Sequence, residues 1–158
     1  MATFVNGTNM VLKLDDTATA GTASTPSATA IGAATSCTLS VTVDTPECTV
    51  KGEGDHKSNV GLSTSWTVDA EMFYNEDETV DFASMFAPAY GVSTAAGVSP
   101  VEANYPRRVY VEFLGNTGGN KYTGYGYISS ISMTGGTEDG ATASVSITGD
   151  GVLTYAAS

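Results

Sequence analysis

The sequence is poor in several residue types that catalytic and metal-binding sites use. Its 158 residues include one histidine, two cysteines, one tryptophan and no glutamine, and six lysines and arginines stand against 17 aspartates and glutamates. The net charge of -11 disfavours holding nucleic acid or an anionic membrane surface through overall charge. The chain has no apolar run of about 18 residues and no basic or apolar N-terminal stretch, so we expect neither membrane insertion nor a secretory signal.

The few candidate reactive groups are interpreted as structural. Cys37 and Cys48 are too few for a disulfide scaffold and lack zinc-site spacing, so we expect both to be reduced and in or near the core. Whether they come together is left open. His56 lies in a polar stretch and is interpreted as a solvated loop residue rather than a general base. We predict no catalytic residue, no metal and no cofactor.

The acidic residues leave one enzymatic alternative open. Any two of the 17 carboxylates could meet across the fold as the pair that glycoside cleavage needs. Sugar-cleaving sites usually carry aromatic platforms and amide side chains as well, and this chain has one tryptophan and no glutamine. The composition therefore favours a protein that is not an enzyme.

The abundant residue types favour β-structure. The chain holds 23 threonines, 16 serines and 18 glycines, while 41% of its residues are apolar and 15% are charged. Threonine packs well on a pleated sheet, and glycine supplies the backbone conformations that tight turns need. The chain is too apolar and too weakly charged for a disordered acidic tail. We expect a single domain, residues 1–158, with a mainly β fold: an antiparallel sandwich or barrel with one short helix.

Alternation of apolar and polar residues predicts strands over much of the chain. Residues 36–44 and 62–74 alternate over unusual lengths, which indicates a large sheet or one shared between subunits. Residues 48–51 are predicted to return as a short partner of the first strand. Further strands are expected at residues 107–114, 122–134 and 142–148, with a short edge strand at 152–155.

Particular residues refine these strands. Trp66 lies on the apolar face of the second long strand, so we expect it in the core. The alternation of residues 122–134 changes phase near Gly124 and Gly126, which fits either a strand pair or one bent strand with a bulge. Arg107 and Arg108, the only basic doublet, are expected to pair with a neighbouring acid rather than read a ligand.

Other segments are expected to be helical or irregular. The apolar spacing of residues 80–86, preceded by acids at 76–78 and followed by Pro88, predicts a short helix. Residues 17–29 are low in complexity and residues 45–61 are polar and rich in turn formers, so both are predicted to be flexible loops.

Six stretches carry a family resemblance through their order and spacing. They are NGTNMVLKL (6–14), IGAATSCTLSV (31–41), DTPECTVK (44–51), SWTVDAE (65–71), YTGYGYISSIS (122–132) and TASVSITGDGVL (142–153). Together they resemble the major tail tube proteins of long-tailed bacteriophages, a group related to gene transfer agent tail proteins. The loop after Lys51 lacks the aromatic residue often found there, and the 17–29 insertion is longer than is usual.

The resemblance implies a structural role. Members form hexameric rings that stack into a hollow tube, so each subunit needs long strands whose open edges neighbours complete. The lumen conducts phage DNA, and a negative wall would let DNA pass without specific binding. The implied partners are further copies of the chain, tail terminator, tape measure and baseplate or distal tail proteins. The implied location is the virion tail, assembled in the bacterial host cytoplasm.

The resemblance also suggests site residues. The lumen candidates lie on the polar faces of the two long strands: Asp44, Asp69 and Glu71. The candidates for ring stacking lie in the loop after the first strand: Lys51, Glu53, Asp55, His56 and Lys57. The alternative hypothesis is a monomeric immunoglobulin-like β-sandwich that serves binding, adhesion or decoration, and it would keep a fully paired fold in isolation.

Overall fold

The computed structural model shows a mainly antiparallel β fold, as the sequence predicts. It describes residues 11–15, 28–31, 34–48, 57–74, 85, 89, 108–115, 120–135 and 140–157. One sheet contains all the described strands, in the spatial order β2-β1-β5-β6-β7-β4-β3, and every pairing is antiparallel. The strands are β1 Val11–Asp15, β2 Thr29–Ala30, β3 Ala34–Asp44, β4 Ser63–Phe73, β5 Arg108–Leu114, β6 Lys121–Thr134 and β7 Thr142–Ala156.

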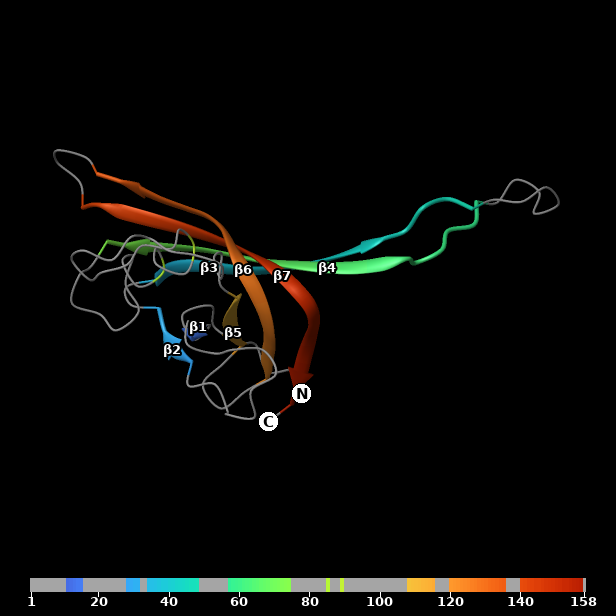
Figure 1. Ribbon diagram of the computed structural model, residues 1–158, viewed down its shortest axis with the longest axis horizontal. Coiled ribbons are helices and arrows are strands. Elements are labelled where there is room, and N and C mark those ends of the chain that lie inside the picture. The colour runs from blue at the N-terminus through green and yellow to red at the C-terminus, as the bar shows by residue number, and fades with distance from the viewer. Residues whose placement is uncertain are drawn as a thin grey trace, which may run out of the picture.

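The sheet folds over on itself because β6 and β7 each take part in two layers (Figure 1). We call layer A the part formed by β3, β4, residues 142–148 of β7 and residues 128–134 of β6. Layer B is formed by β2, β1, β5 and the remaining halves of β6 and β7. Two long strands therefore link the layers covalently as well as through hydrogen bonds.

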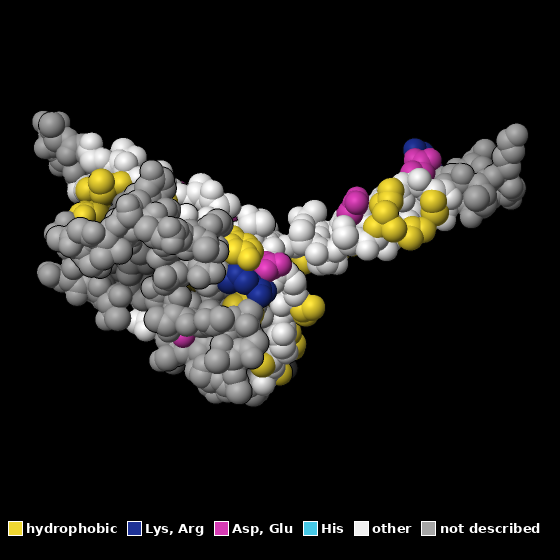
Figure 2. Space-filling model, viewed as in Figure 1, with side chains coloured by type: hydrophobic (Ala, Val, Ile, Leu, Met, Phe, Trp, Pro, Cys, Tyr) yellow, Lys and Arg dark blue, Asp and Glu magenta, His cyan; other side chains and the backbone are white. Residues whose placement is uncertain are grey.

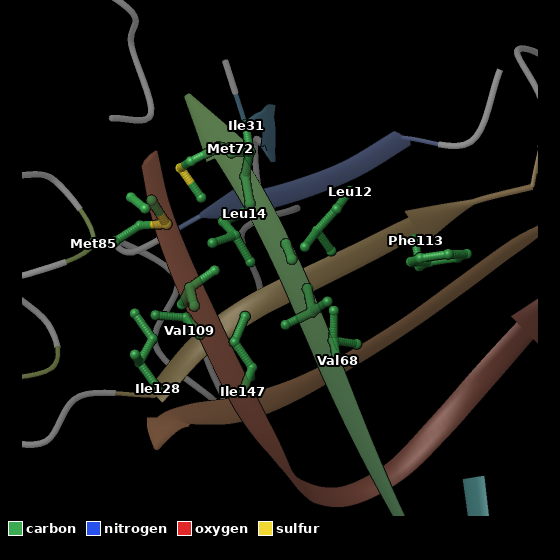
Figure 3. Packing of buried hydrophobic residues seen from close by; sticks show 14 of the residues in the cluster. Leu12, Leu14, Ile31, Val68, Met72, Met85, Val109, Phe113, Ile128 and Ile147 are labelled. Carbon is green, nitrogen blue, oxygen red and sulfur yellow. The ribbon is translucent and has the colours of Figure 1, made fainter. Parts of the chain in front are cut away.

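The core lies between the two layers (Figure 3). Every second residue of the strands points into it, as the period of two requires. Trp66, which the sequence places in the core, is 3% exposed. The buried side chains include Leu12 and Leu14 of β1, Val109, Val111 and Phe113 of β5, Trp66, Val68, Ala70 and Met72 of β4, and Ala143, Val145 and Ile147 of β7.

Glycines form the crease where β6 and β7 pass from one layer to the other. The pairing of β6 with β7 shifts between Thr123 and Tyr125, so Gly124 lies at the predicted bulge. A Cβ atom at Gly149 would overlap the indole ring of Trp66, whose Nε1 donates a hydrogen bond to the carbonyl oxygen of Gly151 at 3.1 Å. The bend thus depends on the absence of a side chain beside Trp66.

The structure decides between the two alternatives for one predicted strand and removes the predicted boundary between two others. Residues 122–134 form one bent strand rather than a strand pair, and residues 142–148 and 152–155 belong to the single strand β7. Of the predicted return strand at 48–51, residues 49–51 lie outside the described residues and Cys48 pairs with Ser58, while β3 pairs with β4 along its length, from Ala34 opposite Met72 to Asp44 opposite Ser63. The alternation of β4 matches that of β3 over 11 residues, which favours this long pairing.

The remaining predicted segments are described only in part. Residues 17–27 lie outside the described residues, and Thr29–Ala30 forms the short strand β2. The helix predicted at 80–86 also lies outside them, except for Met85, whose side chain is buried in the core. Among the described residues, no helix has the length and apolarity needed to cross a bilayer.

Candidate assembly surfaces

Layer A has two open edges in the described part of the chain. At one edge β3 pairs with β4 only, over Ala34 to Asp44. At the other edge β6 pairs with β5 through residues 121–127, so its last seven residues, 128–134, pair with β7 alone. Open edges present rows of backbone N–H and C=O groups that can pair with another chain.

The two edges are complementary in direction. Layer A contains four strand segments in the order β6, β7, β4, β3, and each is antiparallel to the next. An even number of alternating strands places β3 antiparallel to β6. A copy set beside the first in the same orientation would therefore bring its β6 edge to β3 as a further antiparallel pair.

The outer face of layer A carries three acids. Alternation places Asp69 and Glu71 of β4 on the face opposite the buried Val68 and Ala70, and both acids are exposed. Asp44 ends β3 opposite Ser63, which shares this outer face. The structure thus brings all three lumen candidates to one polar face, while the four strand segments of layer A contain no lysine or arginine.

Serine hydroxyls hold two of these carboxylates. Ser146 of β7 donates a hydrogen bond to Oδ1 of Asp69, and Ser36 of β3 donates one to Oε2 of Glu71 at 3.3 Å. The hydroxyl oxygens of Ser132 and Ser144 lie 2.7 Å apart on the same face. These serines could not be identified from the sequence, because their roles depend on which strands are neighbours. The only available signal was their position on the polar side of each strand.

The outer face of layer B is instead internally paired. Glu112 contacts two lysines, with its carboxylate oxygens 3.4 Å from Nζ of Lys13 and 3.4 Å from Nζ of Lys121. Nε of Arg108 lies 2.8 Å from Oδ2 of Asp150, which confirms the predicted ion pair for this residue, while Arg107 lies outside the described residues. The Arg108 guanidinium also lies over the ring of Tyr125, 5.1 Å from its centroid.

Beyond the body, β3 and β4 continue as a narrow arm, residues 41–48 and 57–65, which starts next to the buried Trp66 (Figure 1). Backbone hydrogen bonds extend the ladder past Asp44, including Cys48 N–H to the Ser58 carbonyl at 2.8 Å. The ladder thus occupies part of the segment expected as a loop. Lys57, a stacking candidate, lies here with Nζ 2.8 Å from Oε2 of Glu47. The other four, Lys51, Glu53, Asp55 and His56, lie outside the described residues.

The cysteines occupy different environments. Cys37 packs against the core from β3, and burial raises the pKa of its thiol. Cys48 lies on the arm and is exposed, so its predicted place in or near the core is wrong. Both thiols are free in the structure. No group of three histidine, cysteine or acidic side chains among the described residues is arranged to hold a metal ion.

Comparisons with known proteins show the fold. No family model matches the sequence, and no curated protein matches it. A chain of the tail of an empty gene transfer agent particle, determined with C6 symmetry, superimposes with a TM-score of 0.68 at 16% identity. That match covers 96% of this chain and 98% of the other.

Two further solved structures match almost the whole chain. The SPP1 tail tube protein matches with a TM-score of 0.64 at 12% identity over 98% of this chain and 80% of that one. A chain of the anti-feeding prophage baseplate matches with a TM-score of 0.62 at 9% identity, covering 99% and 98%. This chain therefore has the fold that these phage-type tail and baseplate proteins share.

Proposed function

We propose that this chain is a structural subunit of a phage-type tail tube. Copies join side by side into rings, and the rings stack into a hollow tube. The single observation that carries the proposal is that layer A, in the described part of the chain, has two open edges of opposite direction, in a chain with the tail tube fold. Pairing β3 of one copy with residues 128–134 of the next would turn six copies of layer A into one closed barrel. The C6 symmetry of the matching gene transfer agent tail supports the number six.

The polar face of layer A lines the lumen in this proposal. Asp44, Asp69 and Glu71 repeat around each ring, and layer A contributes no cation to offset them. DNA phosphates are repelled by such a wall, while serine and threonine hydroxyls keep it wetted. DNA therefore passes without specific binding, and the protein needs no catalytic residue or cofactor.

The arm and the loop at its end serve ring stacking in this proposal. Lys51, Glu53, Asp55 and His56 belong to the loop, and Lys57 stands at its base in an ion pair with Glu47. Stacked rings would continue until terminator, tape measure and baseplate or distal tail proteins set the ends and length of the tube. The assembled protein belongs to the virion tail, after assembly in the bacterial host cytoplasm.

The immunoglobulin-like module gains no support from the geometry. A sandwich of that kind consists of two sheets, each with its own edges. Here one sheet supplies both layers through β6 and β7, and the arm projects away from the body.

Electron microscopy of the purified chain tests the proposal. The protein would be concentrated at neutral pH in moderate salt, because screening weakens repulsion between acidic subunits. We expect stacked six-fold rings or hollow tubes in negative stain. Monomers that stay dispersed at every concentration and salt, with the edge amides of β3 protected from hydrogen exchange, would contradict it.

A further inference from the structure

The arm exposes large apolar side chains outside the body of the protein. Val41 and Val43 of β3 are 54% and 51% exposed, and Val60 and Leu62 on the other strand of the arm are 45% and 68% exposed. Figure 2 shows hydrophobic side chains gathered on the arm, well away from the body. Four such residues on one narrow ribbon are more than scattered surface hydrophobics.

Val41 and Val43 belong to the face of layer A that forms the core elsewhere. Val41 lies opposite Trp66 and Val43 lies opposite Thr64 in the ladder, so both point to the side on which Trp66 is buried. Farther along β3 the same face carries Leu39 and Cys37, which pack against the core. The core-side face thus continues past the end of the core.

The arm is ordered without a third strand beside it in the described residues. Its ladder runs on through Leu62 N–H to the Asp44 carbonyl at 2.8 Å and Val60 N–H to the Pro46 carbonyl at 3.2 Å. Two-stranded ribbons are marginally stable in water on their own, and an apolar face left in water adds to that cost. The arm therefore gains stability from any surface that covers its core-side face.

Strand lengths indicate what covers it. In layer A, Ile128 lies opposite Ile147, Ile147 opposite Val68, and Val68 opposite Leu39, so these four residues form one row across the sheet. The free edge of β6 starts at this row with Ile128 and runs for seven residues in one direction, whereas β3 has 11 residues and extends to both sides of the row. When the β6 edge of a neighbouring copy pairs with β3 so that its Ile128 is level with Leu39, residues 40–44 of β3 extend beyond the end of that edge. There the neighbour's β6 has already turned through its crease into layer B.

We propose that the core-side face of the arm, centred on Val41 and Val43, docks on a second copy of this chain. The contact rests on the proposed ring, since edge pairing brings the neighbour's crease and layer B beneath the arm. It is an apolar contact separate from the polar loop at the end of the arm. In the free subunit the two valines are exposed, and assembly buries them.

A pair of double variants of the full chain tests the contact. Val41→Asn with Val43→Asn makes the core-side face polar, while Ser40→Asn with Thr42→Asn introduces the same residues on the opposite face of the same strand. Sedimentation measures the protein concentration at which assembly begins, and melting of the dilute monomer measures stability. We expect the valine variant to need at least about tenfold more protein to assemble, and the control variant less than about threefold more. The two monomers should melt within a few degrees of each other.

The outcomes separate this contact from the proposed tube. If the wild type forms tubes and the valine variant assembles at the same concentration, the contact is wrong and the tube stands. If the valine monomer melts far below the control monomer, the face packs within its own chain and the contact is again wrong. If the wild type forms single rings that never stack, and the valine substitutions weaken these rings while the control substitutions do not, the contact stands and the stacked tube is wrong. Monomers at every concentration contradict both.

Discussion

The two outer faces of one sheet differ in how their charges are compensated. On layer B, Glu112 contacts Lys13 and Lys121, so an acid and its cations meet within one chain. On layer A, Asp69 and Glu71 accept hydrogen bonds from serines, and no cation belongs to these strand segments. On the outer face of layer B, acids and cations therefore contact each other within a single subunit. Among the described residues, layer A combines acids that no cation contacts with edges that no strand covers, which suits a surface that other copies could complete.

The largest expected effect concerns the crease that joins the layers. Gly149→Val would place side-chain atoms inside the indole ring of Trp66. Overpacking of this kind should destabilise the fold by about 3 kcal/mol or more. Urea unfolding followed by far-UV circular dichroism measures the loss. Gly135→Ala is the control, because a Cβ there meets nothing within 4 Å. Equal stability of the two variants would show that the layers are not held together at the crease.

The next effect reverses the charge of layer A. Asp69→Lys with Glu71→Lys should leave the fold intact, since both residues are exposed. Tubes of this variant should bind short duplex DNA at least about tenfold more tightly at low salt than wild-type tubes do. Cosedimentation with labelled DNA measures the affinity. Tubes of the neutral variant, Asp69→Asn with Glu71→Gln, should bind DNA with an affinity between those of the wild type and the lysine variant. An unchanged affinity in tubes that still form would place these acids away from the lumen.

A smaller effect compares one substitution on the two faces. Glu112→Gln removes the charge that two lysines contact, from a side chain only 15% exposed, and should lower the free energy of unfolding by about 1 kcal/mol. Glu71→Gln should change it by less than about 0.5 kcal/mol, because Gln can still accept the Ser36 hydrogen bond. Thermal melts of both variants at low and high salt test this, because salt screens the Glu112 ion pairs and should reduce the difference in stability between the two variants. Equal losses would mean that the faces do not differ in charge compensation.

The smallest effect compares the two thiols. Burial raises the pKa of Cys37, so at pH 8 a smaller fraction of this side chain is thiolate than in an exposed cysteine. Packing against the core also limits the access of a reagent to Cys37. Cys48 on the arm is exposed and should react with iodoacetamide at least about threefold faster. Raising the pH above 9 should accelerate alkylation of Cys37 further. Mass spectrometry of peptides from each site measures both rates, and faster labelling of Cys37 would contradict the structure.

Much of the fold follows from local patterns in the sequence. Alternation identifies β3, β4 and β5 to within two residues at each end, and it places Trp66 in the core. The same alternation places Asp69 and Glu71 on an exposed face, because successive side chains of a strand point to opposite sides. The phase change near Gly124 predicts the bulge in β6.

Other features could not be predicted because they depend on strands far apart in the chain. Residues 142–148 and 152–155 are separated by glycines and therefore predict two strands. In the structure they form one bent strand, because Gly149 leaves room for the Trp66 ring of the neighbouring strand β4. Ser146 and Ser36 become partners of the acids only through the register of β7 and β3 with β4. The exposure of Cys48 follows from the arm, whose ladder pairs residues ten or more positions apart.

The sequence by itself determined which side chains share a face, the excess of negative charge and the predominance of strands. These properties are local, because a period of two and a count of charges need no knowledge of neighbours. Only the tertiary structure decided that one sheet folds into two layers, which edges stay open and how far the arm projects. Those outcomes depend on cross-strand register and on Trp66 packing against glycine at the crease, where residues distant in sequence compete for the same space.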